Sequence, residues 1–245
     1  MVKFLVEDEW EADDIISHCK DHGYEYKVLS QDEIRHLSVE EFLEYVPFCS
    51  TLVVQSKLKE KGLDHLIPDT YTAIFEDLYG RKITHITYKD LGSVSFPYFI
   101  KSAGNDKIID GTVVTNKDEL DDVWTNVSRI NDVNPGPDME LYICDPISFM
   151  SEHRLLIGKS TIYGRGFQRG NSDIIPTLDI IENIIRLAKE KFYCVDVGYD
   201  GSKWIIVEVN PPFSLDDFGI ELDKYIQYAV DFWMRVHQNY CVGTR

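Results

Sequence analysis

The chain has 245 residues, 44% of them hydrophobic, so it can bury one large core or two small ones without disulfide staples. Its formal net charge of -17 argues against general binding to nucleic acids or anionic membranes, because both are polyanionic. The start MVKFLVEDEW lacks the pattern of a signal peptide, and no segment approaches the roughly 20 apolar residues that span a bilayer. The five cysteines are scattered without a CxxC pair, which favours reduced thiols. We therefore expect a cytoplasmic protein.

Strand and helix patterns alternate through residues 1–92, which favours a small N-terminal α/β domain with a β-α-β opening. The expected elements are strand 2–6, helix 9–22, strand 24–29, helix 39–45, strand 51–55 and a helical stretch at 69–78.

Residues 93–245 predict a second, larger domain that mixes strands and helices, so the fold class is α/β, including α+β arrangements. The helix at 177–191 has apolar residues at the spacing of one buried face. The last helix, at 222–237, is expected to close this domain. The other expected elements are strands at 98–101, 109–114, 139–144 and 153–163, a helix at 117–127, and two apolar strands around Asp200 and Gly201.

The segment KWIIVEVNPP carries the strongest chemical signal. Side chains alternate along a strand, so Trp204, Ile206, Glu208 and Asn210 are expected on one face. Asp196 lies inside the apolar run VDV, where an unpaired charge would be costly to bury. Two carboxylates and an amide oxygen are ligands suited to Mg²⁺. The plainer interpretation is that each acid is a solvated residue at a strand end.

The magnesium hypothesis depends on the hairpin between these two strands. Asp200-Gly201 favours a two-residue turn, which would aim Asp196 away from the face of Glu208. A loop with an odd number of residues would bring both carboxylates to one face. We predict an odd-length loop.

The segment VDVGYDGSKWIIVEVNPPFSLDDFG resembles the ATP-grasp superfamily, and more narrowly a compact phage and bacterial clade of it. The resemblance implies an ATP-grasp fold in residues 93–245, with Asp196, Glu208 and Asn210 holding the magnesium that bridges the phosphates of ATP. PYFIKSAGNDKIIDG resembles the clade's two phosphate-binding lysines and implies that role for Lys101 and Lys107. Either lysine could equally be a solvated surface group.

Two further segments match the family. MELYI resembles the strand before the adenine-binding hinge, which implies that Glu140, Tyr142 and Ile143 lie near the base. SEHRLLIGKSTIYGRG resembles the family's E-x-R strand, which implies nucleotide binding by Glu152 and catalysis by Arg154. In the Gly-rich YGRGFQRG, Arg165 is a catalytic candidate, while Arg169 beside it fits equally well as part of a solvated turn.

The resemblance implies an ATP- and Mg²⁺-dependent carboxylate-amine ligase that forms an acyl phosphate and then an amide. Its substrates would be a carboxylate and an amine carried by an amino acid, a peptide or a protein. The alternatives are an ATP-binding assembly factor, like the ATP-grasp relatives that assist a translation initiation factor, and a kinase. The first 90 residues are expected to contact substrate more than nucleotide, since the nucleotide motifs lie beyond them. The oligomeric state stays open.

Overall fold

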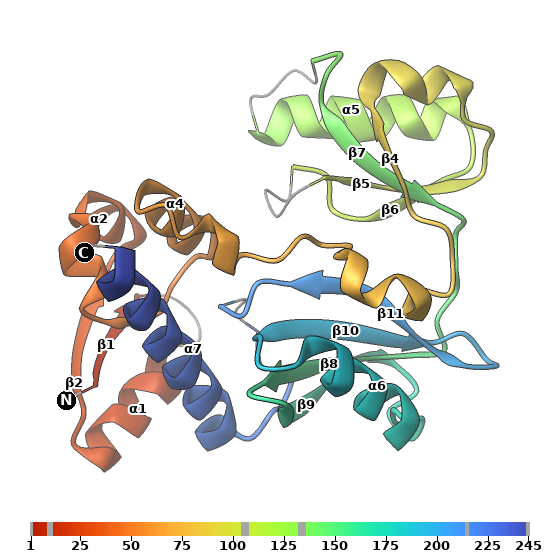
Figure 1. Ribbon diagram of the computed structural model, residues 1–245. Coiled ribbons are helices and arrows are strands. Elements are labelled where there is room, and N and C mark those ends of the chain that lie inside the picture. Colours follow the sequence, from red (N-terminus) through yellow and green to blue (C-terminus); the bar gives the residue numbers. More distant parts are fainter. Residues whose placement is uncertain (1, 9–11, 104–107, 132–135, 214–215, 244–245) are drawn as a thin grey trace.

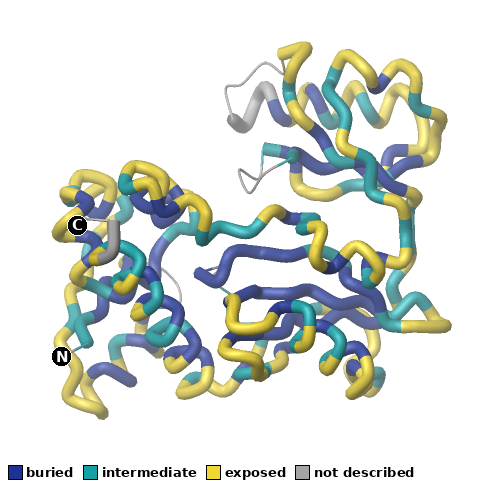
Figure 2. The backbone as a smooth tube through the Cα atoms, in the orientation of Figure 1, coloured by how far each residue is buried: buried dark blue, intermediate teal, exposed yellow. Residues whose placement is uncertain are grey.

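The chain builds three separate β-sheets (Figure 1). A computed structural model describes residues 2–8, 12–103, 108–131, 136–213 and 216–243. The N-terminal sheet has the strand order β2-β1-β3, the central sheet β11-β10-β8-β9 and the third sheet β4-β7-β5-β6. Buried residues concentrate on the strands of the central sheet (Figure 2). No helix in these described ranges is long and apolar enough to cross a membrane.

The N-terminal sheet is parallel, and its β-α-β opening confirms the expected start of the chain. The strand predicted at 51–55 is wrong, because these residues begin helix α4. Val53, Val54 and Leu58 are buried at helical spacing, and the two adjacent valines imitate a strand only in a short window. The elements are β1 (Lys3–Glu7), α1 (Ala12–His22), β2 (Glu25–Leu29), α2 (Gln31–His36), α3 (Val39–Leu43), β3 (Val46–Phe48) and α4 (Thr51–Glu60).

The third sheet combines strands from both sides of residue 92. β4 (Thr84–Thr87) pairs with β7 (Glu140–Cys144), and β7 also pairs with β5 (Tyr98–Ser102). The division of the chain at residue 92 stays a prediction, and this sheet crosses it. The helical stretch expected at 69–78 is a 3₁₀-helix at its end only. The remaining elements here are η1 (Asp64–Leu66), η2 (Ala73–Leu78), η3 (Tyr88–Ser93), β6 (Thr112–Val114) and α5 (Lys117–Asn131).

The central sheet is antiparallel, and α6 (Leu178–Ala188) packs on one face of it. The single strand predicted at 153–163 is wrong, because β8 (Ser151–Gly158) and β9 (Thr161–Gly170) form a hairpin. Lys159 and Ser160 make the turn with φ of 49° and 57°, values usually taken by Gly or Asn, so the sequence concealed it. β10 (Tyr193–Tyr199) and β11 (Trp204–Asn210) complete the sheet.

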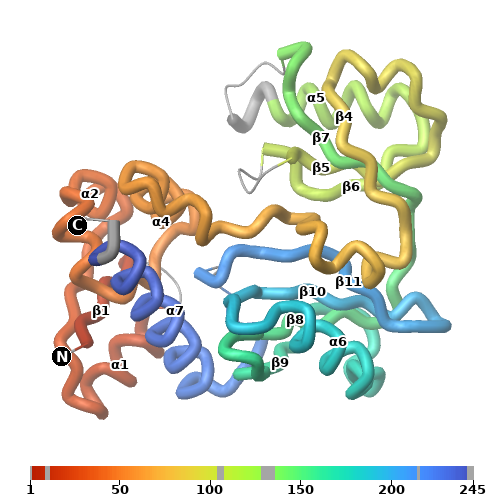
Figure 3. Tube along the Cα trace, viewed as in Figure 1, coloured from red at the N-terminus to blue at the C-terminus, as the bar shows by residue number. Residues whose placement is uncertain are grey.

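The last helix, α7 (Leu222–Gly243), returns the chain to its beginning (Figure 3). Its apolar side chains share one core cluster with the N-terminal elements and with part of the central sheet. The ring of Trp233 packs edge-on against Phe42 of α3, with centroids 5.9 Å apart. Tyr225 packs similarly against Phe48 of β3. α7 was expected to close the second domain, and it also joins that domain to the N-terminal sheet.

We expect Trp233→Ala to lower the free energy of unfolding by about 3–5 kcal/mol, because Trp233 is 2% exposed inside this shared core. Met234, the next residue, is 53% exposed, so Met234→Ala is the matched control and should change stability by less than about 0.5 kcal/mol. Urea unfolding measures both values. Equal effects of the two changes would contradict the packing of α7 described above.

Candidate functional site

The register between β10 and β11 brings the two acidic side chains together. Asp196 pairs directly with Glu208, so both carboxylates lie on the same face of the central sheet, as predicted. Val197, however, pairs with Ile206, which leaves Val207 as an extra residue in a β-bulge. The bulge reverses the alternation before it. Ile206 therefore belongs to the core on the opposite face, and the expectation of one shared face for residues 204, 206, 208 and 210 holds only for the last two.

The prediction of an odd-length loop is wrong. Tyr199 pairs with Trp204, so the loop has four residues, 200–203, and the bulge supplies the shift in register that the loop does not. Asp200 holds this loop, because its Oδ1 accepts hydrogen bonds from the backbone nitrogens of Ser202 at 2.8 Å and Lys203 at 2.9 Å. These local bonds compete successfully with the two-residue turn that Asp-Gly favours.

Arg81 holds the bulge from outside the sheet. Its guanidinium donates to the carbonyl oxygens of Ile206 at 3.2 Å and Val207 at 2.9 Å, the two residues at the bulge. It also donates to Tyr79 O at 3.3 Å and to Cys144 Sγ at 3.2 Å. Sequence analysis missed Arg81, since it follows Gly80 in a connecting segment and no local pattern relates it to residue 207.

Arg154 on β8 forms the buried centre of the site. Its Nε and Nη2 donate to the two carboxylate oxygens of Asp196, each at 2.9 Å. The side chains of Arg154 and Asp196 are only 8% and 5% exposed, and the pair is bidentate. Burial tends to lower the pKa of Arg154, but Cys194 and Asp196 outweigh it and raise the pKa further, so the guanidinium stays charged. Phe218 covers the guanidinium, whose Cζ lies 4.6 Å from the ring centroid.

Asn210 lies between the two acids. Its Nδ2 donates to Asp196 Oδ2 at 2.9 Å and to Glu208 Oε1 at 3.1 Å. Both carboxylates therefore already turn toward one group that carries partial positive charge. Half a turn of the amide would present Oδ1 in place of Nδ2 without changing the shape of the side chain.

Lys101 reaches the site from the third sheet. Its Nζ donates to Glu208 Oε2, which links β5 to β11 across the space between the two sheets. Burial tends to raise the pKa of Glu208, but Lys101, Asn210 and Arg154 outweigh it, and the pKa lies below its ordinary value. Glu208 is therefore ionised at neutral pH. Lys107, the second predicted lysine, lies outside the described residues.

The two candidate arginines of β9 point to different faces of the central sheet. Arg169 pairs with Glu152, and its Nε donates to Glu152 Oε1 at 2.7 Å. A second bulge, at Gln168, then shifts the register, so that Arg165 pairs with Leu155 on the opposite face from Arg154. The structure brings Arg169 to the site and does not bring Arg165. Burial raises the pKa of Glu152, and Arg169 only partly opposes this effect.

A cavity of about 490 Å³ lies between the central and third sheets, next to the charged cluster. Phe99 and Cys144 line it from the third sheet, and Glu152, Arg169 and Val207 line it from the central sheet. Arg81 also lines it, and is the only described lining residue from the first 92. Its remaining lining residues are Gly111, Thr112, Val113, Asp145, Ile147, Ser148, Phe149 and Gly170.

The three residues predicted near the adenine lie on β7 and do not line this cavity. Tyr142 pairs with Lys101, so it shares the face toward the central sheet, whereas Ile143 packs in the core of the third sheet. Glu140 is exposed and lies 3.8 Å from His85 Nε2. β7 runs between β4 and β5, so its backbone groups already face neighbouring strands. Backbone available to a base begins after Cys144, in residues 145–149.

We expect Arg81→Gln to lower the free energy of unfolding by about 1–3 kcal/mol, because it leaves the carbonyls at the bulge without their donor. Amide hydrogen exchange of residues 206–210 should also speed up relative to the rest of the sheet. Lys82→Gln is the control, since Lys82 is exposed and its replacement removes the same charge. Unchanged exchange in the Arg81 variant would show that Arg81 does not hold the bulge.

Solved structures of the same fold cover almost the whole chain. A D-alanine–D-alanine ligase from Bacillus anthracis complexed with ATP is 15% identical with a TM-score of 0.59, over 98% of this chain and 99% of that chain. A RimK domain ATP-grasp protein from Sphaerobacter thermophilus DSM 20745 is 13% identical with a TM-score of 0.54, over 95% and 98%. The ATP-grasp ligase PsnB, complexed with a minimal precursor, is 9% identical with a TM-score of 0.52, over 95% and 98%. These similarities show an ATP-grasp fold and confirm the expected α/β class.

No curated protein sequence matches the chain. A family described as an ATP-grasp domain, the second family of its clade, matches residues 78–228, which is more than half of the chain. This span contains the charged cluster on β5, β8, β10 and β11, together with Arg81. The match confirms the resemblance found in the sequence, and the chain belongs to this family of ATP-grasp domains.

Proposed function

We propose that this protein is an ATP-dependent ligase that joins a carboxylate to an amine through an acyl phosphate. One observation carries the proposal: two buried cations and two carboxylates pair with one another beside a cavity between two sheets. The cavity would take the nucleotide base, since it is lined by Phe99, Phe149 and the free backbone of residues 145–149. The phosphates would then lie toward Lys101 and Arg154.

The ion pairs support phosphate binding because they can exchange partners without leaving a charge uncompensated. Lys101 neutralises Glu208, and Arg154 neutralises Asp196, so the four groups carry no net charge. ATP with bound magnesium brings both an anionic and a cationic partner. Lys101 and Arg154 would turn toward phosphate oxygens, and the two carboxylates would turn toward the metal. Each charge would keep an opposite charge throughout, which avoids the cost of burying an isolated ion.

Asp196, Glu208 and Asn210 are suited to hold magnesium. They offer carboxylate and amide oxygens from paired positions on one face, and both acids already share the amide nitrogen of Asn210. Bound Mg²⁺ would neutralise the charge that develops on the transferred phosphoryl group. Among the chain's own groups, Lys101 would orient the phosphates, and Arg154 would hold the transferred phosphoryl group in two places.

Arg169 is the better candidate than Arg165 for holding the substrate carboxylate. It lines the cavity and lies beside Glu152, while its guanidinium is 73% exposed and can reach an entering anion. Glu152 would accept hydrogen bonds from the nucleotide or from the amine. PsnB, which has the same fold, is a ligase complexed with a precursor peptide, and this supports a peptide among the substrate classes of an amino acid, a peptide and a protein.

The reaction can be followed by its oxygen atoms. A carboxylate oxygen would attack the γ-phosphorus of ATP, and ADP would leave. The amine nitrogen would then attack the acyl carbon, lose a proton and expel phosphate, which keeps the carboxylate oxygen. We expect ¹⁸O from a labelled carboxylate to appear in phosphate, measured by mass spectrometry across a panel of amino acids and peptides with hydroxylamine as the general amine.

The same assay separates the alternatives. A ligase requires the carboxylate for ADP release and forms a hydroxamate with hydroxylamine. A kinase would release ADP and form a stable phosphorylated product without an amine, and an assembly factor would bind a protein in a stoichiometric complex without forming a new amide. Phosphate free of ¹⁸O from a substrate that supports turnover would contradict the acyl phosphate.

We expect Glu208→Gln to abolish the effect of Mg²⁺ on ATP binding, because it removes a metal ligand charge and keeps the shape of the side chain. Without Mg²⁺, this variant should bind ATP at least as tightly as the wild type, because one negative charge near the phosphates is gone. Magnesium-dependent turnover should fall more than about a hundredfold. Calorimetric titration with and without Mg²⁺ tests this, with Glu182→Gln on α6 as an exposed control. Full enhancement by Mg²⁺ in the variant would remove Glu208 from the site.

A further inference from the structure

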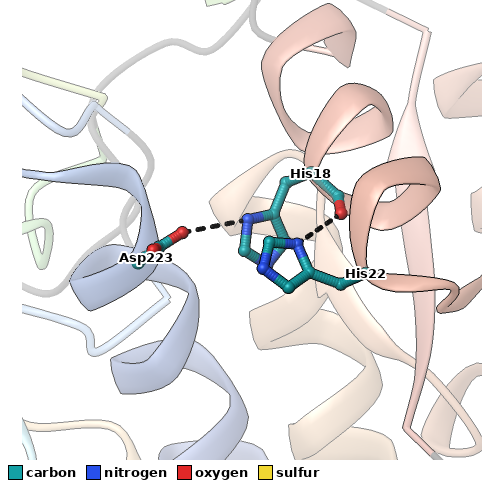
Figure 4. A group of neighbouring side chains, drawn as sticks. All are labelled: His18, His22 and Asp223. Carbon is teal, nitrogen blue, oxygen red and sulfur yellow. Dashed lines mark hydrogen bonds and ion pairs between the residues drawn. The ribbon is translucent and has the colours of Figure 1, made fainter.

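Two histidines of α1 and one aspartate of α7 point toward one another where these helices meet (Figure 4). His18 and His22 are four residues apart, so they share a face of α1, and their rings stack with centroids 4.1 Å apart. His18 Nδ1 lies 3.2 Å from Asp223 Oδ1. One ligand atom from each side chain lies within 4.8 Å of the other two, and the described residues hold no second group of this kind.

The hydrogen bonding of His22 prepares its other nitrogen to bind a metal. His22 Nδ1 lies 3.0 Å from the backbone oxygen of His18. A carbonyl oxygen only accepts, so Nδ1 carries the proton and Nε2 keeps its lone pair. Histidines that bind metals are usually oriented in this way, by a carbonyl or carboxylate on the nitrogen that does not bind.

His18 is buried, with a side chain 8% exposed, while Asp223 is 69% exposed. Burial lowers the pKa of His18 and the neighbouring His22 lowers it further, against the opposite effect of Asp223. The neutral imidazole, which is the form that binds metals, therefore predominates at neutral pH. The ring of Tyr24 packs against both histidines, with centroids 6.0 Å and 5.9 Å away, and limits their rotation.

The spacing and the donor atoms indicate a particular class of ion. In a tetrahedral zinc site with bonds of about 2.0–2.1 Å, ligand atoms lie roughly 3.3 Å apart, close to the separation of His18 Nδ1 and Asp223 Oδ1. His22 and Asp223 are exposed and can close the remaining distance by side-chain rotation. A cavity of about 200 Å³ beside them leaves room for water as a fourth ligand. Two imidazoles and one carboxylate suit Zn²⁺, whereas Mg²⁺ takes oxygen ligands.

We propose that His18, His22 and Asp223 form a Zn²⁺ site that ties α1 to the first turn of α7. The site is separate from the charged cluster of the central sheet and does not depend on the proposed ligase activity. Its ion would join the N-terminal sheet to the helix that closes the shared core. A ligand that binds only the folded chain stabilises it, so Zn²⁺ should raise the melting temperature.

The test uses the full chain freed of metals by a chelator, in buffer with excess Mg²⁺ to supply the acidic cluster. Calorimetric titration should show one Zn²⁺ bound per chain and a higher melting temperature, and Co²⁺ should give the visible absorption of a four-coordinate site. His22→Gln and Asp223→Asn both change exposed residues, so the fold should persist. Each should weaken Zn²⁺ binding by more than about tenfold and remove the Co²⁺ spectrum.

Three control variants show where the ion binds. His36→Gln removes an exposed histidine that lies 3.7 Å from Asp32, and Cys241→Ser removes an exposed thiol. Both should keep wild-type Zn²⁺ affinity, and so should Glu208→Gln, which tests the proposed function independently. Wild-type affinity in His22→Gln and Asp223→Asn would overturn the site, as would the absence of Zn²⁺ binding by the wild-type chain.

Discussion

The β-bulge at Val207 sets which side chains of β11 face the third sheet. Without the extra residue, the four-residue loop at 200–203 would pair Asp196 with Val207 and turn Glu208 toward the opposite core. The bulge also interrupts the hydrogen-bond ladder, so its carbonyl groups need donors from elsewhere. The guanidinium of Arg81 supplies them, and the same side chain lines the cavity. The geometry of the charged cluster therefore depends on a contact between residues 125 positions apart.

Burying several charges at the junction of two sheets is tolerable only because each has a partner. Arg154 satisfies both oxygens of Asp196, and Lys101 and Asn210 share Glu208 between them. Such pairs add little net stability, since desolvation offsets much of their attraction, but loss of one member leaves a buried charge behind. This makes the cluster responsive to ligands. A polyanion with its own cations can replace the internal partners one for one.

The proposed nucleotide site and the Zn²⁺ site lie at opposite ends of the same core. α7 packs against Phe42 and Phe48 of the N-terminal elements, while the cluster that contains it also includes Leu156 and Cys194 of the central sheet. By register, Leu156 and Cys194 lie on the face that carries Arg154 and Asp196. One face of the central sheet is thus apolar where it meets α7 and charged where it meets the third sheet.

The sequence alone determined the features that depend on neighbouring residues. The β-α-β opening, helix α6 and the strands with Asp196 and Glu208 follow from local periodicity, and the family follows from a continuous motif. Tertiary structure decided the features set by single-residue shifts and distant contacts. Bulges at Val207 and Gln168 placed Glu208 beside Asp196 and turned Arg169, rather than Arg165, toward the site. Helix α4 replaced an expected strand because Val53, Val54 and Leu58 find their core partners only when the chain is packed. A bulge changes one pairing and reverses every side chain before it, so strand periodicity could not reveal it.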